Sequence, residues 1–521
     1  MKFRIDGNQL VVTQASRIEY HQLQNHLTRH VKNHRFNPRV KAGVWDGRIS
    51  YFNKGKINIG LWKECFLLCQ KNEWKFEIEN KDDFPMDREI TYEKFLAFCT
   101  DFFKDHKLKD GVTPMFPYDH QIQSAFKILR NRYCITEVAT GGGKSLIFAL
   151  VVFYVLREIK PDARFLLMVP NISLVCQFTD DIKEYNEGMN GENKHPLALG
   201  VDEIMSDKPR RSEGQANIFI GTSASLEKRP KEWFKQFYGV ASDEAHKAGQ
   251  GADSNIKQVA KVLERTMPHA HLRFGMSGTF PAETTVDYLT IQSLLGPKIA
   301  EVRADALMQK GVITPVKVKS LILNHNDLEF NNNVTFLKRG GQGKVAYDLE
   351  KKYVQQSEKR MDFVFDKILS KITKNTLVLF HIKEYGERIF QRALDSLPDV
   401  ECYHIDGDTK AEVREHIKTR MEDTTGKPKL LVASFGTLST GVSVKALCTV
   451  VFMESYKSEQ IVIQSIGRIL RLHTDKETAI AFDVVDTFAP SKGNVLYAHY
   501  LERRSFYENR NYPNQELYIN L

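Results

Sequence analysis

Residues 133–156 read YCITEVATGGGKSLIFALVVFYVL, in which an apolar strand pattern meets an apolar helix pattern at a glycine-rich turn. The glycines let backbone N–H groups face a phosphate, Lys144 suits its β- and γ-oxygens, and Ser145 offers a hydroxyl to Mg²⁺. Val138 stands where the simple phosphate-loop pattern has Gly. The alternative, a plain turn before a core helix, is disfavoured by the flanking strand and helix. The predicted ATP-binding residues here are Thr140, Gly141, Gly142, Gly143, Lys144 and Ser145.

Outward from this loop, strand-like and helical runs alternate from Pro117, and a second series without a phosphate loop begins near Val312. The strand-like runs of the first series are YCITEVA (133–139), RFLLMVP (164–170), ANIFIGT (216–222), FYGVASDEAH (237–246) and LRFGMSGT (272–279). This alternation predicts an α/β protein with parallel sheets covered by helices on both faces. LKRGGQGK at 337–344 is a glycine-rich basic loop. The expected organisation is a small nucleic-acid-binding accessory domain at 1–85, a linker at 86–114, an ATPase lobe at 115–311, a second lobe at 312–490 and a C-terminal extension at 491–521.

A pair of carboxylates follows a strand pattern in DEAH at 243–246. Adjacent carboxylates repel each other, which is tolerable beside a divalent cation. Asp243 is therefore predicted to hold Mg²⁺ through water, together with Ser145. Glu244 is predicted to polarise the attacking water, and His246 to relay to another motif. A solvated turn is the alternative, and the upstream phosphate loop disfavours it.

Two arginines three residues apart occur in QSIGRILR at 464–471. Arg468 and Arg471 are expected on one face of a helix, with Gln464 one turn earlier. A guanidinium is permanently charged and forked, so this pair suits γ-phosphate stabilisation as an arginine finger. Two surface arginines on an amphipathic helix are the alternative. The catalytic set predicted from the residues is Lys144, Glu244, Arg468 and Arg471.

Bulk properties bound the class of protein. The chain has 521 residues, 42% hydrophobic and 27% charged, with a net charge of +9, values typical of a globular protein that tolerates a polyanionic partner. No secretory signal is evident, and the longest apolar run, 146–156, is too short to span a bilayer. A soluble, cytoplasmic enzyme is expected. The seven scattered cysteines favour small buried residues over a structural metal site.

Basic and aromatic residues alternate between 29 and 56. Such a mixture suits phosphates and unpaired bases, and Arg35, Arg39 and Arg48 are the predicted DNA contacts. A solvated basic face is the alternative for the cluster, and a place in a small core is favoured for Trp45. The basic members are Arg29, Lys32, Arg35, Arg39, Lys41, Arg48, Lys54 and Lys56, and the aromatic ones are Phe36, Trp45, Tyr51 and Phe52.

The motif set resembles that of superfamily-2 DEAH-containing DNA helicases over residues 115–475, which implies two RecA-like lobes. By this resemblance Gln121 reads adenine, Gln464 and Gly441 contact ATP, and Ser277, Gly278 and Thr279 in GMSGT couple hydrolysis to strand movement. VPNISLVCQ (169–177), GTSASL (221–226), LVLFH (377–381) and SFGTLSTGVSV (434–444) resemble the backbone-gripping motifs. The DNA contacts that these motifs imply are Pro170, Gln177, Gly221, Thr222 and Thr440.

Within that superfamily the chain resembles phage recombination and branch-migration helicases, including their N-terminal domain at HRFNPRVKAGVWDGRI, 34–49. Ser443 stands where many relatives have Asp. The resemblance implies remodelling of forks, Holliday junctions and R-loops during recombination, repair and replication in an infected bacterial cell. Partners would be branched DNA, RNA–DNA hybrids, and recombination or single-strand-binding proteins. A duplex translocase without strand separation and a clamp with a vestigial ATPase are the alternatives; intact Lys144, Glu244 and Arg471 disfavour the latter.

Overall fold

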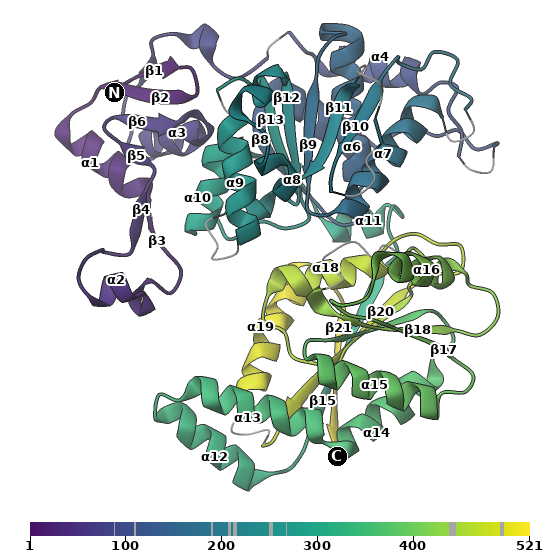
Figure 1. Cartoon of the computed structure of the whole chain (residues 1–521). Helices are drawn as coiled ribbons and strands as arrows, with labels where there is room; N and C mark the ends of the chain where they lie inside the picture. The colour runs from purple at the N-terminus through teal and green to yellow at the C-terminus, as the bar shows by residue number, and fades with distance from the viewer. Residues whose placement is uncertain are drawn as a thin grey trace. The chain divides into compact units, whose positions relative to one another are not determined.

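The computed structural model comprises two compact units. The first contains Met1–Val138 and Gly143–Val302, and the second contains Ala139–Gly142 and Arg303–Leu521. The chain is described throughout except at 88, 109–110, 189–190, 207–209, 212–215, 250–253, 267, 437–443 and 490–493. Each unit holds a seven-stranded, wholly parallel sheet (Figure 1), which confirms the predicted α/β class with two RecA-like lobes.

The first unit begins with a small mixed α/β domain. Its sheet has the order β5-β6-β2-β1-β7, and helices α1 (Arg17–His26) and α3 (Trp62–Lys71) pack on it. Ser16 and Glu19 form a capping box at the start of α1, with Ser16 N donating to Glu19 Oε2 over 2.6 Å. The strands are β1 (Lys2–Asp6), β2 (Gln9–Gln14), β5 (Phe52–Asn53), β6 (Lys56–Asn58) and β7 (Glu77–Ile78).

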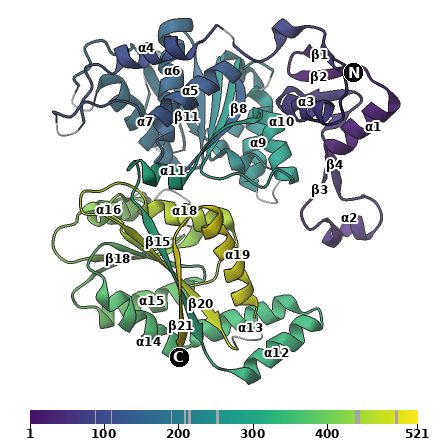
Figure 2. The ribbon, with the colours of Figure 1, turned by 180° about the vertical axis from the view of Figure 1, so that it is seen from behind.

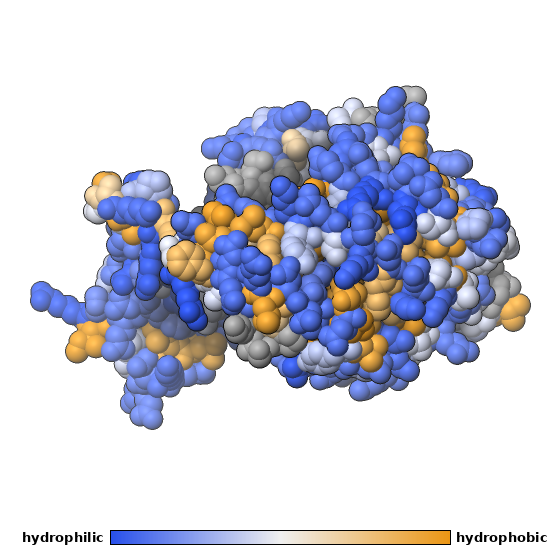
Figure 3. Space-filling model, turned by 90° about the horizontal axis from the view of Figure 1, so that it is seen from below, coloured by the Kyte–Doolittle hydropathy of each residue, from blue (hydrophilic) through white to orange (hydrophobic). Residues whose placement is uncertain are grey.

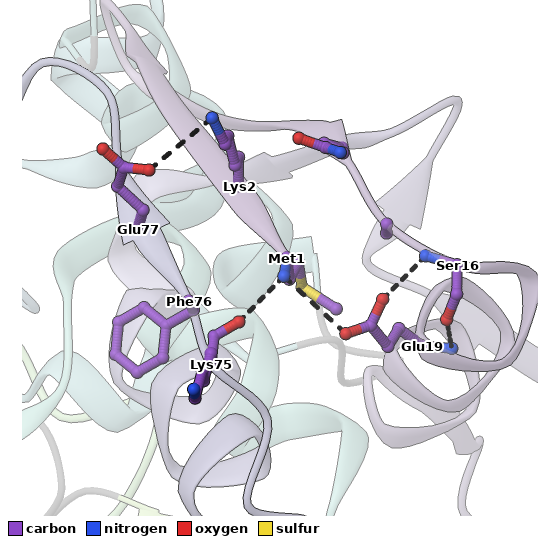
Figure 4. A pocket seen from close by; sticks show the side chains of 9 residues that line it. Met1, Lys2, Ser16, Glu19, Lys75, Phe76 and Glu77 are labelled. Carbon is purple, nitrogen blue, oxygen red and sulfur yellow. Dashed lines mark hydrogen bonds and ion pairs between the residues drawn. The ribbon is translucent and has the colours of Figure 1, made fainter.

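The start of the chain is fastened to this domain. The Met1 ammonium donates to the Lys75 carbonyl over 2.8 Å and lies 3.7 Å from Glu19, which also caps α1 (Figure 4). An open groove of about 670 Å³ adjoins these contacts and is lined largely by β1, Ser16 and the 75–77 segment. The groove is lined by none of the predicted site residues.

A two-stranded arm, residues 28–50, extends from the small domain (Figure 2). Strand β3 (Thr28–His30) pairs antiparallel with β4 (Arg48–Ser50), and the loop between them carries η1 (His34–Phe36) and α2 (Pro38–Lys41). Trp45 does not enter a core, contrary to the prediction; it is half-buried and its indole N–H donates to the Arg48 carbonyl over 3.0 Å. With so short a segment there is no layer for Trp45 to pack into, so it braces the arm instead.

The small domain is packed against α10 (Val286–Leu295) of the same unit. Leu289 of α10 enters the small domain's core, and the Tyr51 hydroxyl bonds to Thr290. A Cβ on Gly60 would collide with the Gln292 carbonyl oxygen, so the two backbones are in close contact. Buried Arg273 donates to Asn8 Oδ1 over 2.6 Å, which adds a polar tie.

The first parallel sheet has the strand order β10-β11-β9-β12-β13-β8-β14. Alternate residues of β9 serve opposite faces: Phe165, Leu167 and Val169 join the core under α5, α6 and α7, whereas Leu166 and Met168 join the core under α9 and α10. The sequence patterns anticipated β8 (Tyr133–Val138), β9 (Phe165–Val169), β11 (Ala216–Thr222), β12 (Gly239–Asp243) and β13 (Leu272–Ser277), but not the edge strands β10 (Gly200–Ile204) and β14 (Lys298–Val302).

Residues 92–102, expected within a linker, form helix α4 (Tyr92–Phe102) instead. Phe95, Phe98 and Phe102 are buried in the core that α6 (Lys144–Tyr154) shares with α4, so this segment is part of the first lobe. Helix periodicity of the aromatic residues produces this burial. The remaining helices of this lobe are α5 (Asp119–Asn131), α7 (Ile172–Glu187), α8 (Ser223–Glu227) and α9 (Ser254–Thr266).

The second sheet has the order β17-β18-β16-β19-β20-β15-β21. The tail, to which the sequence assigned no structure, supplies α19 (Val495–Asn509) and edge strand β21 (Asn514–Asn520), which pairs with β15. Buried Arg503 of α19 anchors it through Asp483 at 2.8 Å. The other strands are β15 (Val316–Asn324), β16 (Thr376–Phe380), β17 (Glu401–Ile405), β18 (Lys429–Ser434), β19 (Thr449–Phe452) and β20 (Ala479–Thr487).

The glycine-rich basic loop lies at the tip of a helical hairpin in the second unit. Helices α12 (Leu328–Arg339) and α13 (Gly343–Gln356) form this hairpin beside the second sheet (Figures 1 and 2). Three further helices, α14 (Glu358–Lys367), α15 (Lys383–Ser396) and α16 (Ala411–Glu422), complete the connections between its first strands.

Candidate nucleotide site and nucleic-acid interface

The phosphate loop leads from β8 into α6 through glycines in a left-handed conformation. Gly141 and Gly143 have φ of +85° and +77°, a region in which side chains are strained. Gly143 is the N-cap of α6, so the positive end of the helix dipole and its first N–H groups lie at the loop. The sequence therefore produces an anion-binding backbone here.

Gln121 of α5 lies directly against this loop. A Cβ on Gly143 would collide with the Gln121 amide nitrogen, and Gln121 Oε1 accepts from Tyr118 N over 2.9 Å. The amide is thus oriented by the N-terminus of α5 while contacting the phosphate loop. Gln121 and Gly143, predicted as nucleotide contacts, are brought together.

Ser145 has a neighbour that the sequence did not indicate. Its Oγ lies 3.2 Å from the hydroxyl of Tyr185 on α7. Burial raises the pKa of Tyr185 far above its ordinary value, so the phenol stays protonated and can donate or accept a hydrogen bond. Tyr185 belongs to a helical pattern whose other members are core residues, and only the packing of α7 on α6 reveals the contact.

Asp243 is the last residue of strand β12, and Glu244 follows it. The pKa values of the two carboxyl groups are shifted in opposite directions. Burial raises the pKa of Asp243 above its ordinary value, and among the described residues its Oδ1 has no hydrogen-bond partner. Burial also disfavours ionised Glu244, but the Lys144 ammonium and His246 outweigh it and hold the Glu244 pKa well below the usual range. Glu244 adopts φ of +47°, a strained conformation that costs about 1–3 kcal/mol and occurs frequently at functional sites.

DEAH and GMSGT meet in one hydrogen-bonded cluster. The Nδ1 of His246 lies 2.8 Å from Ser277 Oγ and 3.2 Å from Glu244 Oε2. Ser277 Oγ is in turn 2.7 Å from the Thr279 carbonyl oxygen, and Thr279 N donates back to it over 3.3 Å. The parallel pairing of β12 with β13 sets these residues side by side, 31 positions apart between His246 and Ser277. A change at Glu244 therefore has a direct route to the segment containing Gly278.

The predicted DNA-contacting segments 169–177 and 221–226 begin at the ends of neighbouring parallel strands, β9 and β11. Pro170 follows β9, and with Ser223 and Asp243 it lines a cavity of about 40 Å³. Gly221 and Thr222 end β11; the Thr222 hydroxyl accepts from Ser225 N over 3.3 Å and caps α8. Gln177 lies half-buried on α7. The Thr222 side chain thus has a local structural partner that the motif alone did not indicate.

The two arginines of QSIGRILR are not on one helix, which corrects the prediction. Helix α18 (Glu459–Ile469) contains Gln464 and Arg468, but it ends before Arg471. The last carbonyls bond elsewhere: Thr314 donates to Leu470 O over 2.7 Å and to Arg471 O over 3.1 Å. These tertiary hydrogen bonds end the helix where periodicity alone would continue it.

Buried Lys476 fixes this helix end from the other side. Its ammonium donates to the Ile469 carbonyl and to the carbonyls of Lys445 and Leu447, each within 3.0 Å. Burial lowers its pKa to about 8. Lys476 therefore ties residues 445–447, which follow SFGTLSTGVSV, to the QSIGRILR segment. Thr440, Gly441 and Ser443 lie outside the described residues.

The predicted DNA contacts of the arm are on its surface. Arg35, Arg39 and Arg48 are exposed, and the Arg48 guanidinium bonds to His30 over 3.1 Å. The aromatic residues divide into two groups: Phe36 is 74% exposed, whereas Phe52 is buried and Tyr51 is bonded to α10. Only Phe36 among these three presents its ring to solvent.

Comparisons with known proteins agree with this geometry. The DEAD/DEAH box helicase family matches residues 118–287, the helicase conserved C-terminal domain matches 359–473, and the DNA helicase UvsW N-terminal domain matches 2–79. The chain is a superfamily-2 DEAH-containing DNA helicase. It therefore uses ATP and binds nucleic acid.

Individual proteins are similar to this chain over much of its length. The ATP-dependent DNA helicase UvsW of Enterobacteria phage T4 is 29% identical over 471 residues, which cover 90% of this chain and 87% of that protein. The crystal structure of T4 UvsW aligns with 100% of this chain and 99% of its own at 25% identity and a TM-score of 0.47. The DNA-bound restriction–modification enzyme LlaBIII shares the fold over 78% of this helicase and 32% of its own length, with a TM-score of 0.56 and 13% identity.

Membrane-spanning helices and clusters of metal-binding side chains are both absent from the described part of the chain. No helix there is both long and apolar enough to cross a bilayer. No group of three or more His, Cys, Asp or Glu side chains there is arranged to hold a metal ion. Cys65 and Cys69 are buried in the core of the small domain.

Proposed function

We propose that this helicase uses ATP and Mg²⁺ to remodel branched DNA, including forks, Holliday junctions and R-loops, in recombination, repair and replication. The observation that carries the proposal is the arm, whose exposed arginines belong to the same compact unit as Lys144 and the DEAH segment, 243–246. A motor that grips only the backbone does not distinguish a branch, so branch selectivity requires an added surface. The similarity to the phage helicase UvsW supports the same role in the cytoplasm of an infected bacterium.

The residues of the first lobe fit a divalent cation. Asp243 Oδ1 is buried without a hydrogen-bond partner among the described residues, and Ser145 begins the helix behind the phosphate loop. A buried carboxylate oxygen in this state suits a hard cation, which prefers oxygen ligands. Asp243 and Ser145 would hold Mg²⁺, which when bound neutralises charge on the β- and γ-phosphate oxygens.

Hydrolysis would be divided among the remaining motif residues. The backbone of Thr140–Gly143 and the Lys144 ammonium would bind the phosphates, and Gln121 the adenine. Glu244, kept ionised by Lys144 and His246, would orient the attacking water and accept its proton. Arg468 and Arg471 would stabilise charge on the γ-phosphate as it develops. Gln464 and Gly441 would complete the nucleotide contacts.

The cluster of His246 and Ser277 would couple hydrolysis to movement. When the water that Glu244 orients is consumed, the bonds of Glu244 to His246 and Ser277 would rearrange, and Gly278 and Thr279 would follow. The backbone of DNA would be held by Pro170, Gln177, Gly221, Thr222 and Thr440. Arg35, Arg39 and Arg48 would bind phosphates at the branch.

The direct test compares DNA-stimulated ATP turnover and product formation on single strands, blunt duplex, forks, four-way junctions and RNA–DNA hybrids. We expect each of these nucleic acids to stimulate ATP turnover. Products should form at lower enzyme concentration on forks and four-way junctions than on the other substrates. Translocation with no strand exchange on any branched substrate would instead support a duplex translocase. Failure of DNA to stimulate ATP turnover would contradict the motor assignment.

A further inference from the structure

The tip of the α12–α13 hairpin, residues 336–345, has the composition of a nucleic-acid contact. It reads FLKRGGQGKV, and no acidic residue occurs between Phe330 and Tyr347. Lys338, Arg339 and Lys344 are exposed, and none of them forms an ion pair with a described residue. The tip is thus a local concentration of positive charge that the motor motifs do not use.

The tip also exposes apolar surface that a solvated loop does not require. Phe336 is 76% exposed and Val345 is 48% exposed, on the two helices that flank the loop. The face visible in Figure 3 is mostly hydrophilic with small separate hydrophobic patches, so a large apolar interface is not a general feature of this surface. An exposed aromatic ring among cations is the combination that binds unpaired nucleotides, through base stacking and phosphate attraction.

The backbone at the tip is open to a ligand. Gly341 has φ of +78°, and a Cβ at Gly341 or Gly343 would meet no atom within 4 Å. Gln342 N donates to Leu337 O over 2.9 Å, which closes the turn without covering its outer side. Glycines in such a turn let a phosphate approach the main chain closely.

The base of the hairpin is fixed, so the tip has a defined position within the second unit. Buried Glu350 of α13 accepts from Val495 N over 2.9 Å and from Leu496 N over 2.8 Å, and so caps helix α19. Val354 packs with Phe488 and Leu496 below it. A buried carboxylate in this position is stabilised by the cap, and it holds α13 to the tail of the chain.

We propose that the hairpin tip is a second DNA-binding site, in which Lys338, Arg339 and Lys344 bind phosphates and Phe336 stacks on an unpaired base. The site is separate in sequence from the arm and from every motif residue. It rests on the chain's activity as a DNA helicase, but not on the branch selectivity proposed above. Unpaired DNA is favoured over an acidic protein because an aromatic face and an open glycine turn add to the charge.

The experiment uses the full chain and measures binding of a fluorescent oligothymidine strand as a function of salt. The test variant is Lys338→Glu/Arg339→Glu/Lys344→Glu. Its matched control, Lys359→Glu/Lys367→Glu/Lys371→Glu, makes the same charge change at exposed positions in and after α14 of the same unit. We expect the test variant to bind at least about tenfold more weakly and to lose roughly 0.7 of salt slope per lost phosphate contact, with unchanged DNA-independent ATP turnover.

Stacking is tested separately by Phe336→Ala, which should weaken binding about tenfold with the salt slope unchanged, and by Phe336→Trp, which should restore it. Equal behaviour of the test and control variants would overturn the proposal and would leave an acidic protein as the tip's ligand. A wild-type enzyme without DNA-stimulated ATP turnover would contradict the motor function. The salt slopes of the test and control variants would still show whether the tip binds DNA.

Discussion

The phosphate loop and the N-terminal arm are both built around cations, but the two regions are constrained in opposite ways. The backbone of the phosphate loop is held in one conformation. Two of its glycines are left-handed, Gly143 caps α6, and the Gln121 amide packs against it. In the arm, the exposed arginines lie on a short two-stranded ribbon and on the loop between its strands, and Trp45 and His30 bond to Arg48. The phosphate loop therefore has a fixed geometry in which each member has its own role, whereas the exposed cations of the arm each add a separate increment of affinity.

The largest expected effect is that of Lys144→Ala. Loss of the only lysine in the phosphate loop should lower ATP turnover by about 10³-fold or more, because no other side chain of the loop supplies a preorganised positive charge. DNA affinity should remain within a few fold. Steady-state ATPase and strand-binding assays measure both, with Lys160→Ala, an exposed lysine of the same lobe, as control. Near-normal ATP turnover of the Lys144→Ala variant would show that the phosphate loop does not depend on this charge.

Arg471→Ala should have the next largest effect. We expect kcat to fall on the order of 10³-fold and ATP affinity to change little, because a finger acts mainly on transition-state charge. Arg468 lies within α18 and Arg471 lies beyond its end. Comparison of Arg468→Ala with Arg471→Ala therefore separates an effect on helix stability from the loss of a charge. Thermal denaturation and nucleotide titration provide the readouts, and Arg504→Ala is the surface control. A loss confined to nucleotide binding would assign a structural role to this segment.

Ser277→Ala should uncouple rather than inactivate. The substitution removes the hydroxyl that lies 2.8 Å from His246 and 3.3 Å from Glu244. A hydrogen bond to a charged group contributes about 1.5–3 kcal/mol, so we expect about a tenfold loss of strand separation per ATP hydrolysed, with smaller loss of turnover. Ser293→Ala, also a buried hydroxyl, is the control. Parallel loss of both activities would show that the cluster serves hydrolysis alone.

The smallest effect is expected at the arm. Arg35→Glu/Arg39→Glu/Arg48→Glu should weaken fork binding about tenfold and lower the salt slope by roughly 0.9 per lost duplex phosphate contact. ATP turnover at saturating single strand should persist. The control Lys63→Glu/Lys71→Glu/Lys75→Glu changes the same charge at exposed positions of the same domain. Unchanged fork affinity in a folded variant would remove the arm from branch recognition.

The motor region was the most predictable part of the chain because its signals are local. A glycine-rich turn between an apolar strand and an apolar helix has few structural solutions, and the five anticipated strands of the first sheet are buried runs next to turn residues. The edge strands β10 and β14 escaped prediction because partial exposure weakens their apolar pattern. Helix α4 escaped it because charged residues on both sides resemble a linker.

The end of α18 marks the limit of periodicity. Leu470 and Arg471 continue the helical pattern, yet hydrogen bonds from Thr314 and Lys476 take the terminal carbonyls. Both donors lie outside the helix, so no local rule places them. The structure of the tail was not predicted for a similar reason, because β21 is a strand by virtue of its pairing with β15. The paired residues, such as Asn324 and Asn520, are 196 positions apart in the sequence.

The sequence alone determined the ATPase chemistry of this helicase, its two parallel sheets and its family, because these follow from residue order within short segments. Tertiary structure alone decided which distant groups meet: Tyr185 with Ser145, His246 with Ser277, Glu350 with the start of α19, and the small domain with α10. Such contacts depend on strand order and helix packing, which are set by the burial of the whole core and not by any one segment.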